Sequence, residues 1–464
     1  MPGGAPSGWL GSLSGGGASL MRWLYSLLMA LAQVGLRRKL VRRARAEPLY
    51  GEAVPERFGR YTTAWPKAPG PTVWLHAVSL GETRTAALLL GPLRQALPGM
   101  RLLLTHGTAT GRAEGARLLQ AGDVQVWQPW DSTGPVQRFL KQFRPDIGIL
   151  METEVWPNLV ATCRQQGVPL VLANARLSER SYQKAQRLAW LARPAYRALA
   201  AVWAQTPDDA RRLQALGAPV QGVFGNLKFD ARPDAAQVAT GREGRASLGR
   251  PVAMLASSRD GEEAQLLQIL KQKMALSPVN NGVLAINSVA IEPQWLIVPR
   301  HPQRFDEVAA LVQAQGFGLV RRSQGGPWPP VAQSGQSNGG QTPTIWLGDS
   351  LGEMALYYGL ANVALLGGSF APLGGQNLIE AAACGCPVLM GPHTFNFAEA
   401  AELALAAGAA QRLGSMEEGV AAVQALLGQP AQQQAMAAAA FRFAGAHSGA
   451  GQRTVTAVQA FLLA

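Results

Sequence analysis

Short apolar runs alternate with helical patterns along most of the chain. From residue 71 the runs read VWLHAV, RLLLTH, VQVWQP, IGILMET, LVLANA, AVWAQT and VQGVFG. After residue 251 a second set reads VAMLASS, WLIVPR, TIWLGD, NVALLGG and PVLMG. Buried parallel strands separated by helices produce this rhythm. The pattern predicts an α/β chain with two doubly wound, Rossmann-like domains that face a central cleft.

The rhythm stops at residues 228–251, where a polar segment with prolines predicts a linker between domains. We expect an N-terminal α/β domain over residues 47–232 and a C-terminal α/β domain over residues 233–464. The alanine-rich segment from about residue 430 has helical spacing. It predicts a C-terminal helix that packs back on the first domain.

Two stretches interrupt the second domain, at residues 277–293 and 323–343. The second of them is rich in Gly, Gln, Ser and Pro. Such a composition cannot bury enough apolar surface to order the backbone. It predicts a mobile surface insertion.

The first 46 residues have a different pattern. Residues 23–36 (WLYSLLMALAQVGL) carry no charge, and six of the nine residues from Arg37 to Arg45 are basic. Fourteen helical residues extend only about 21 Å, whereas a bilayer core is about 30 Å thick. No small-residue cleavage site follows, so we expect an uncleaved N-terminal membrane-anchor helix that spans the bilayer or lies in its interface, with its basic side toward the cytoplasm. The alternative is a buried core helix with a solvated basic tail.

The charge balance favours anionic partners. The formal net charge is +13 and the pI is near 10.2, which suits nucleic acid, phosphorylated small molecules or an acidic membrane surface. No RRM, KH or helix-turn-helix signature supports nucleic acid. The three cysteines, Cys163, Cys384 and Cys386, form neither a disulfide framework nor a zinc site, which fits a reduced, cytosolic setting.

Two glutamates follow strands in the first domain. HAVSLGE places Glu82 at a strand-to-helix turn, and METEVWPNL places Glu152 at the end of another strand. Neighbouring carboxylates raise each other's pKa, which makes one of them a better base near neutral pH. Ordinary helix capping or surface roles remain the alternative for both residues.

The second domain carries groups suited to anions. Arg300 and His301 directly follow a strand, where an arginine can fork onto a phosphate. In residues 365–397 two glycine turns precede a helix start, and a carboxylate suited to ribose hydroxyls lies one turn in. These residues are Gly367, Gly368, Gly374, Gly375, Gln376, Asn377 and Glu380. No P-loop, no GxGxxG after the first strand and no Asp-x-Asp clamp is present, so we expect no cofactor and a metal-independent transfer.

The ordered blocks HAVSLGE, METEVWPNL, ANARLSERS, GNLKFD, VPRHPQRF, GDSLGEM and GGSFAPLGGQNLIEAAACGCPVLMGPHTFNF resemble the Kdo (3-deoxy-D-manno-oct-2-ulosonic acid) transferases of lipopolysaccharide synthesis. The resemblance implies an inverting GT-B glycosyltransferase at the cytoplasmic face of the inner membrane. Its donor would be CMP-Kdo. Its acceptor would be a lipid A precursor of the lipid IVA type, an acylated and phosphorylated glucosamine disaccharide, and its other partners anionic inner-membrane lipids rather than nucleic acid.

The resemblance also implies roles for individual residues. Glu82 would be the general base and Glu152 a second catalytic carboxylate. The CMP-Kdo side would use Lys228, Arg300, His301, Gly368, Ser369, Gly375, Gln376, Asn377 and Glu380. Gln376 and Arg259 each replace a histidine that is usual in the family, so the details on the donor side differ.

Two other functions remain open on the sequence alone. A UDP-sugar transferase or a nucleotide-sugar epimerase would share the helix start near Glu380. A non-catalytic basic module that binds nucleic acid or lipid head groups would not need Glu82.

Overall fold

The computed structural model describes residues 14–65, 69–275, 292–325, 328–330 and 343–463. The chain forms two compact units, each described by itself below. Unit 1 comprises Met1–Asp230 and Ser448–Ala464, and unit 2 comprises Ala231–His447. The chain therefore passes from unit 1 to unit 2 and returns for its last helix.

The described residues of unit 1 contain a parallel seven-stranded sheet in the order β3-β2-β1-β4-β5-β6-β7. Its strands are β1 (Thr72–His76), β2 (Arg101–His106), β3 (Val124–Trp127), β4 (Ile147–Met151), β5 (Leu170–Ala175), β6 (Ala201–Ala204) and β7 (Val220–Val223). The strand order reverses between β1 and β4. In doubly wound sheets this switch point opens a crevice at the carboxyl ends of the strands.

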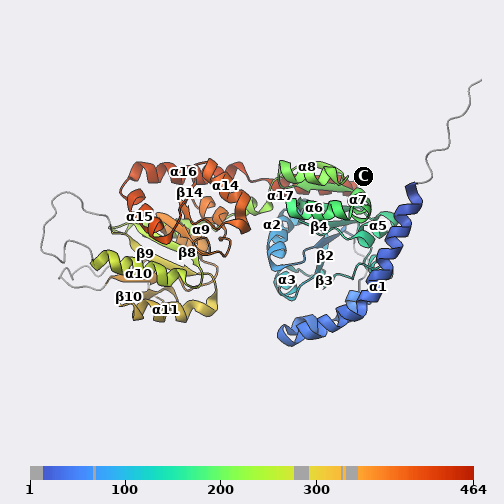
Figure 1. Ribbon diagram of the computed structural model, residues 1–464, viewed down its shortest axis with the longest axis horizontal. Helices are drawn as coiled ribbons and strands as arrows, with labels where there is room; N and C mark the ends of the chain where they lie inside the picture. Colours follow the sequence, from blue (N-terminus) through green and yellow to red (C-terminus); the bar gives the residue numbers. More distant parts are fainter. Residues whose placement is uncertain (1–13, 66–68, 276–291, 326–327, 331–342, 464) are drawn as a thin grey trace, which may run out of the picture. The chain divides into compact units, whose positions relative to one another are not determined.

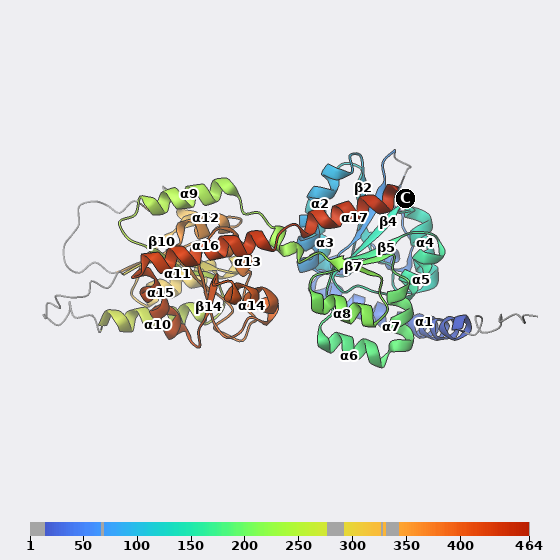
Figure 2. The same ribbon diagram turned by 90° about the horizontal axis from the view of Figure 1, so that it is seen from above.

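Helices cover both faces of this sheet (Figures 1 and 2). The described helices of unit 1 are α1 (Ser14–Ala46), η1 (Pro48–Gly51), η2 (Val54–Phe58), α2 (Leu80–Ala96), α3 (Ala109–Gly115), η3 (Ala116–Leu118), α4 (Thr133–Phe143), α5 (Pro157–Gln165), α6 (Glu179–Arg187), α7 (Ala189–Arg197), α8 (Pro207–Ala215), η4 (Leu227–Asp230) and α17 (Ala450–Leu463). Successive side chains of β1 point to opposite faces. Trp74 packs with Phe139 of α4 on one side, while Val73 and Leu75 pack with Leu89 of α2 on the other.

The last helix, α17, completes unit 1. Val455 and Val458 lie in the same buried cluster as β1 and α2, and Gln459 donates from Nε2 to the Ala96 carbonyl at 3.0 Å. The Asp230 carboxylate accepts hydrogen bonds from the N–H groups of Gly449 and Gly451 where the chain re-enters. Figure 2 shows α17 running across this unit.

Unit 2 repeats the architecture. Its described strands are β8 (Val252–Ser258), β9 (Gln294–Pro299), β10 (Gly318–Arg321), β11 (Thr344–Leu347), β12 (Val363–Leu366), β13 (Val388–Met390) and β14 (Ala410–Arg412), in the parallel order β10-β11-β9-β8-β12-β13-β14. Its helices are α9 (Ala235–Ala246), α10 (Glu262–Ala275), η6 (Pro302–Arg304), α11 (Phe305–Ala314), η7 (Arg322–Gln324), α12 (Met354–Leu360), α13 (Leu378–Ala383), η8 (Phe395–Phe397), α14 (Ala398–Ala406), α15 (Met416–Leu427) and α16 (Pro430–Ala446). Here the strand order reverses between β8 and β12.

The boundary between the two units, from Asp230 to Ala231, falls inside the predicted linker at residues 228–251. Much of that segment is nevertheless a packed helix, which the sequence interpretation did not include. Its centre forms α9, which packs along α12. Val238 is buried there, and a Cβ on Gly241 would lie 2.3 Å from the Leu356 carbonyl oxygen, so the two helices approach closely. The polar residues of the segment are the outer face of a packed helix.

Residues 14–46 form one long helix, α1, that continues through the basic cluster. It contacts α5 and α7 of unit 1, and Ser26 donates from Oγ to Oδ1 of Asn158 at 3.0 Å. No helix within the described part of the chain is long and apolar enough to cross a membrane. The spanning form of the predicted anchor is therefore not borne out, and the interfacial form stays a prediction.

The first predicted insertion lies outside the described residues from 277 to 291, and the second does so at 326–327 and 331–342. Two short strands, β10 and β14, were not predicted. Both lie at an edge of the unit 2 sheet and carry partly exposed or polar side chains. Their sequences therefore lack the continuous apolar run by which the other strands were identified.

Candidate active site

Glu82 lies at the start of α2, just beyond the carboxyl end of β1. Ser79 is the N-cap, and its Oγ accepts the Glu82 N–H at 3.3 Å while its hydroxyl donates to Oε1 of Glu82 at 2.9 Å. The N–H of Val78 donates to Oε2 at 2.9 Å. This arrangement resembles a capping box, except that the carboxylate accepts the N–H of Val78, the residue before the N-cap. The capping alternative from the sequence is therefore present. A carboxylate has about four acceptor positions, and lone pairs remain for a substrate hydroxyl.

The surroundings of Glu82 raise its affinity for a proton. The side chain is half-buried. Burial raises its pKa, and the negative charge of Glu152 adds to that rise. The hydrogen bonds from Val78 and Ser79 and the positive charge of Arg176 act in the opposite direction. The net effect is a raised pKa, which gives the carboxylate more proton affinity than an exposed glutamate has.

Glu152 directly follows β4, the strand next to β1 at the switch point. Its backbone has a φ of +57°, a conformation that non-glycine residues adopt only where the surroundings enforce it. The side chain is buried, and its Oε2 lies 3.1 Å from Nε of Arg176, which follows β5. The fold therefore brings the two predicted catalytic carboxylates into electrostatic contact.

A third carboxylate belongs to the same group. Burial, followed by the charges of Glu82 and Glu152, raises the pKa of Glu154 to about 7, against the opposing hydrogen bond from Trp156. That bond runs from Nε1 of Trp156 to Oε2 of Glu154 at 2.9 Å. Neither Glu154 nor Arg176 was given a role from the sequence. Both directly follow predicted strands, and that position was the available signal.

Histidines 76 and 106 are structural. Both are buried, and burial is the largest cause that lowers their pKa, to about 3 and about 4. Nδ1 of His76 lies 2.9 Å from Oγ1 of Thr105, and Nδ1 of His106 lies 2.8 Å from the Ala77 carbonyl oxygen.

Lys228 lies in η4 of unit 1, in a partly exposed position. Its N–H donates to Oδ1 of Asn226 at 3.0 Å. The other predicted donor-side residues all lie in unit 2.

In unit 2 the predicted donor residues gather around the carboxyl ends of β8, β9 and β12. Arg300 follows β9, and its Nε donates to Oε1 of Gln376 at 3.1 Å. Gly368 follows β12 with a φ of +68°, and a Cβ there would lie 3.2 Å from Nε2 of Gln376. Gly375, with a φ of +73°, donates to the Gly368 carbonyl at 2.7 Å. The two glycine turns therefore hold each other beside Arg300.

The remaining residues of this group surround those turns. Asn377 caps the six-residue helix α13, and its Oδ1 accepts the Ile379 N–H at 3.2 Å. Burial raises the pKa of Glu380, against the positive charge of Arg300. His301 is exposed, and its pKa is lowered by partial burial and then by the charges of Arg259, Arg300 and Arg304.

The Ser369 side chain faces inward, contrary to a ligand-binding role for its hydroxyl. It is fully buried, donates to the Leu366 carbonyl and accepts the Gly391 N–H at 2.8 Å. Its hydroxyl therefore connects the ends of β12 and β13. We assign the Ser369 side chain to holding the loop in place.

Glu262 holds together the turns at the carboxyl ends of β8 and β12. It was not singled out from the sequence. Its carboxylate accepts the N–H groups of Gly368 at 2.7 Å, Arg259 at 2.9 Å and Phe370 at 3.3 Å. The residue is buried at the start of α10. One carboxylate thus joins the turn after β8 to the turn after β12.

The comparisons with known proteins agree with this arrangement. The family model of 3-deoxy-D-manno-octulosonic-acid transferase (kdotransferase) matches residues 52–231. The 3-deoxy-D-manno-octulosonic acid transferase of Bordetella pertussis is 46% identical over 419 residues, which cover 88% of this chain and 91% of the relative. The chain belongs to the Kdo transferase family.

Other members and solved structures fit the family assignment. The Kdo transferase of Haemophilus influenzae is 29% identical over 421 residues, covering 89% of this chain and 92% of the relative. Among solved structures, a glycosyltransferase from Rickettsia africae aligns with a TM-score of 0.51 at 12% identity, over 85% of this chain and 99% of its own. MurG of Acinetobacter baumannii aligns with a TM-score of 0.50 at 15% identity, over 84% and 99%. These two likenesses confirm the predicted GT-B-like α/β fold.

Proposed function

We propose that this Kdo transferase moves Kdo from CMP-Kdo to an acylated, phosphorylated glucosamine disaccharide of the lipid IVA type, with inversion. The observation that carries the proposal is the half-buried carboxylate of Glu82 at the switch point between β1 and β4, beside Glu152. Open α/β sheets place their chemistry at this position. Membership of the family supplies the sugar.

In the proposed step, an acceptor hydroxyl gives its proton to the Glu82 carboxylate as its oxygen attacks the anomeric carbon of Kdo. The bond from that carbon to the phosphate oxygen of CMP breaks, and CMP leaves with the electron pair. The raised pKa of Glu82 favours proton uptake in the transition state. Glu152, fixed by Arg176, orients the acceptor or tunes Glu82.

On the donor side, we assign Arg300 and the helix start at Asn377 to the phosphate of CMP. A guanidinium and backbone N–H groups stabilise the charge that grows on a leaving phosphate without reorganising. Lys228 is the further cation proposed for this role. We assign Glu380 to the ribose, whose hydroxyls would donate hydrogen bonds to its carboxylate. We propose that the reaction needs no metal.

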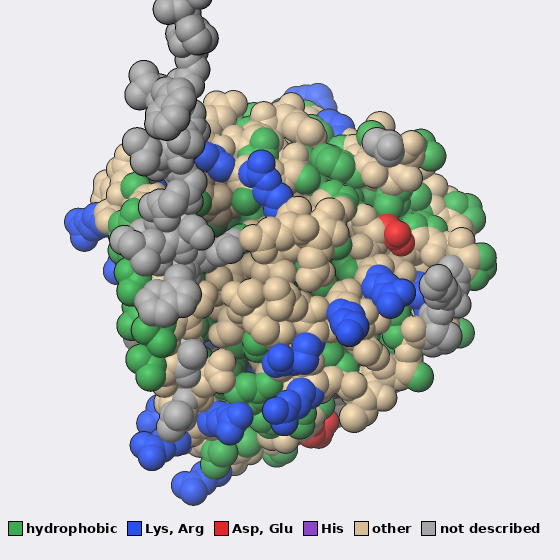
Figure 3. Space-filling view, turned by 90° about the vertical axis from the view of Figure 1, so that its right-hand side faces the viewer, with side chains coloured by type: hydrophobic (Ala, Val, Ile, Leu, Met, Phe, Trp, Pro, Cys, Tyr) green, Lys and Arg blue, Asp and Glu red, His purple; other side chains and the backbone are tan. Residues whose placement is uncertain are grey.

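For the location, we propose that α1 lies in the interface of the inner membrane at its cytoplasmic face. The helix exposes Leu27, Leu28 and Leu31, by 44%, 63% and 69%, and then the basic cluster from Arg37 to Arg45. An anionic membrane surface binds helices in which apolar side chains lie beside cationic ones. The face in Figure 3 carries many Lys and Arg side chains and few acidic ones.

The decisive experiment is an assay with CMP-Kdo and a lipid IVA acceptor, read out by the mass of the product. The key variant is Glu82→Gln, which keeps the shape and the capping but cannot take the proton. Loss of a general base lowers the rate by about 10²- to 10⁴-fold. UDP-sugars are tested in parallel, and transfer from one of them in place of CMP-Kdo would contradict the proposed donor.

The chain contains a matched control at the start of α15. There Ser415 caps the helix, Glu418 occupies the same position as Glu82, and Gly414 donates to Oε2 of Glu418 at 2.7 Å. Glu418→Gln makes the same chemical change in a second capping arrangement of the same kind, on a helix of unit 2. It is expected to transfer Kdo at the wild-type rate, so a loss with both variants would count against a catalytic role for Glu82.

The proposed location has a separate test. Leu28→Gln with Leu31→Gln is expected to reduce flotation of the full chain with phosphatidylglycerol vesicles. The control, Phe441→Gln with Leu463→Gln, changes two other exposed apolar side chains, which are 61% and 88% exposed. Equal flotation of all three proteins would refute the membrane role of α1.

A further inference from the structure

A basic pocket lies at the amino-terminal ends of the unit 1 strands, whereas Glu82 lies beyond the carboxyl end of β1. Its wall includes Thr72 at the start of β1, Arg101 at the start of β2 and Asp146 just before β4. The pocket and Glu82 lie at opposite ends of β1. The five residues of this strand extend over about 16 Å. A ligand held here is therefore not the group that reacts at Glu82.

Five cations line this cavity of about 780 Å³, and one acidic residue does. The cations are Arg60, Arg101, Arg138, Lys141 and Arg144. The acidic residue is Asp146, whose Oδ2 accepts the Thr72 N–H at 2.7 Å. Like charges gathered around one cavity repel each other, and an anion that enters it removes this cost.

Most of these cations have no carboxylate partner. In the described parts of the chain no ion pair involves Arg60, Arg138, Lys141 or Arg144. Nη2 of Arg138 donates to the Phe58 carbonyl at 2.6 Å, and Nε of Arg144 donates to the Lys141 carbonyl at 3.3 Å. Carbonyl acceptors position a guanidinium and leave its net charge in place.

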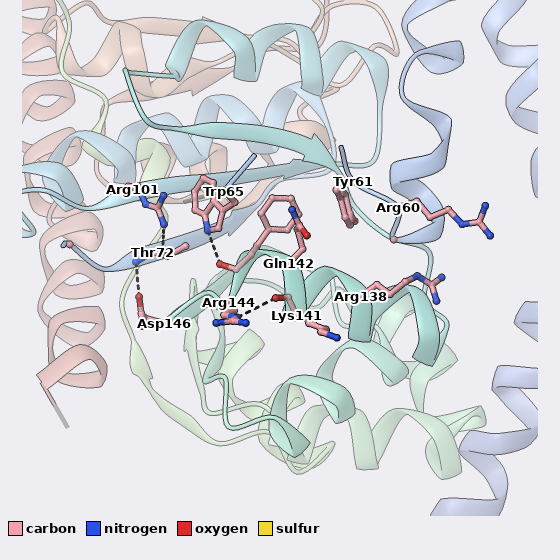
Figure 4. A pocket seen from close by; sticks show the side chains of 13 residues that line it. Arg60, Tyr61, Trp65, Thr72, Arg101, Arg138, Lys141, Gln142, Arg144 and Asp146 are labelled. Carbon is pink, nitrogen blue, oxygen red and sulfur yellow. Dashed lines mark hydrogen bonds between the residues drawn. The ribbon is translucent and has the colours of Figure 1, made fainter. Parts of the chain in front are cut away.

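Side chains that are held by specific contacts form part of the pocket wall. The Arg101 guanidinium lies 3.9 Å from the centre of the Trp65 ring, and Nε1 of Trp65 donates to the Phe143 carbonyl at 2.8 Å. Figure 4 shows Arg101 and Trp65 on one side of the pocket and Lys141 and Arg144 on another. A small ligand could thus meet cations from more than one direction.

We propose that this pocket is a second, non-catalytic anion site that binds a phosphate-bearing ligand. Arginine forks match phosphate oxygens, and several cations around one cavity favour a ligand with more than one negative charge. The phosphate can belong to a lipid head group or to a free soluble compound. The proposal does not depend on the sugar that the enzyme transfers.

The test compares full-length wild type with the double variant Lys141→Gln and Arg144→Gln, two exposed positions. The control is Lys271→Gln with Arg442→Gln, the same loss of charge at exposed positions in unit 2. Each protein is titrated with inorganic pyrophosphate by calorimetry at low ionic strength, with saturating CMP present throughout. Unchanged melting temperatures establish that the variants are folded.

The pocket variant is expected to bind pyrophosphate about five- to tenfold more weakly than wild type, because two charge-assisted contacts are lost at a partly solvated site. The control is expected to match wild type. Trp65→Phe provides a second measurement, since a change in tryptophan fluorescence with pyrophosphate should shrink in this variant if the ligand lies beside that ring.

Flotation with phosphatidylglycerol vesicles distinguishes the two sources. A loss of flotation in the pocket variant alone identifies a lipid head group, and unchanged flotation with weakened pyrophosphate binding identifies a soluble phosphate. The proposal is overturned if wild type binds neither probe, or if the pocket variant binds both as wild type does.

Discussion

Ser79 and Glu82 hold each other through two hydrogen bonds, one from the serine hydroxyl to Oε1 at 2.9 Å and one from the Glu82 N–H back to Oγ at 3.3 Å. The same pair of contacts both starts α2 and fixes the direction of the carboxylate. A residue needed to begin a helix is thereby fixed in place beyond the end of β1. The proposed base obtains its orientation from the local capping geometry.

Ser79→Ala is expected to move the acidic limb of the transfer rate against pH to higher pH. The hydroxyl stabilises the charged form of Glu82, so its removal raises the pKa of that carboxyl group further. A base must be deprotonated to act, and its deprotonated fraction at a given pH then falls. The loss of the cap also costs about 1 kcal/mol of stability.

Ser415→Ala separates these two effects. It removes the equivalent cap from α15 at a similar cost in stability. Its pH profile of Kdo transfer should match that of wild type. If the profiles of the two serine variants coincide, Ser79 does not act through Glu82.

Glu154→Gln is expected to stabilise the protein at high pH and to leave it unchanged at low pH. Folding raises the pKa of Glu154 from 4.5 to about 7, so the folded state disfavours the ionised form. That penalty begins above pH 4.5 and is complete above pH 7, where it reaches at most about 3 kcal/mol.

The measurement is the free energy of unfolding of both proteins at pH 5 and at pH 8. The side-chain oxygen of glutamine can still accept the Trp156 N–H, so both proteins keep this hydrogen bond. A difference between variant and wild type that does not grow with pH would show that Glu154 ionises normally.

Glu262→Gln is expected to destabilise the turns after β8 and β12 in unit 2, where the proposed donor-binding residues lie. The carboxylate accepts three backbone N–H groups, and the amide nitrogen of glutamine would face at least one of them without accepting. The cost is on the order of 2–3 kcal/mol. Because the turn of Gly368 loses its support, the KM for CMP-Kdo should rise more than kcat falls. Glu417→Gln, on the exposed first turn of α15, is the control.

Gly367→Ala is expected to destabilise the protein by about 1–3 kcal/mol. A Cβ at this position would lie 2.4 Å from the Ser257 carbonyl oxygen, which is backbone and cannot turn aside. Gly445→Ala, where nothing lies within 4 Å of the new Cβ, should be neutral or stabilising by up to about 1 kcal/mol. Urea unfolding of the two variants provides the comparison, and equal stabilities would contradict the close approach of β8 and β12.

Much of the fold could be predicted from the sequence because its signals are local. Continuous apolar runs identified the strands that are buried on both faces, such as β1 and β4, and Glu82 was placed at a strand-to-helix turn from its own few residues. Where the local signal is weak, prediction failed. The strands β10 and β14 are short and lie at edges, and α9 has a polar outer face that resembles a linker.

The chain by itself determined which residues follow the strands, and so supplied Glu82, Glu152, Arg300 and Gly368 as candidates. Only the tertiary structure decided which of them meet. The strand order places β1 beside β4 although about 70 residues separate them, and this brings Glu152 and Arg176 to Glu82. The tertiary structure also buried the side chain of Ser369 and gathered five cations at the amino-terminal ends of the unit 1 strands. Burial and neighbouring charge set these roles, and both depend on contacts between residues that are distant in the sequence.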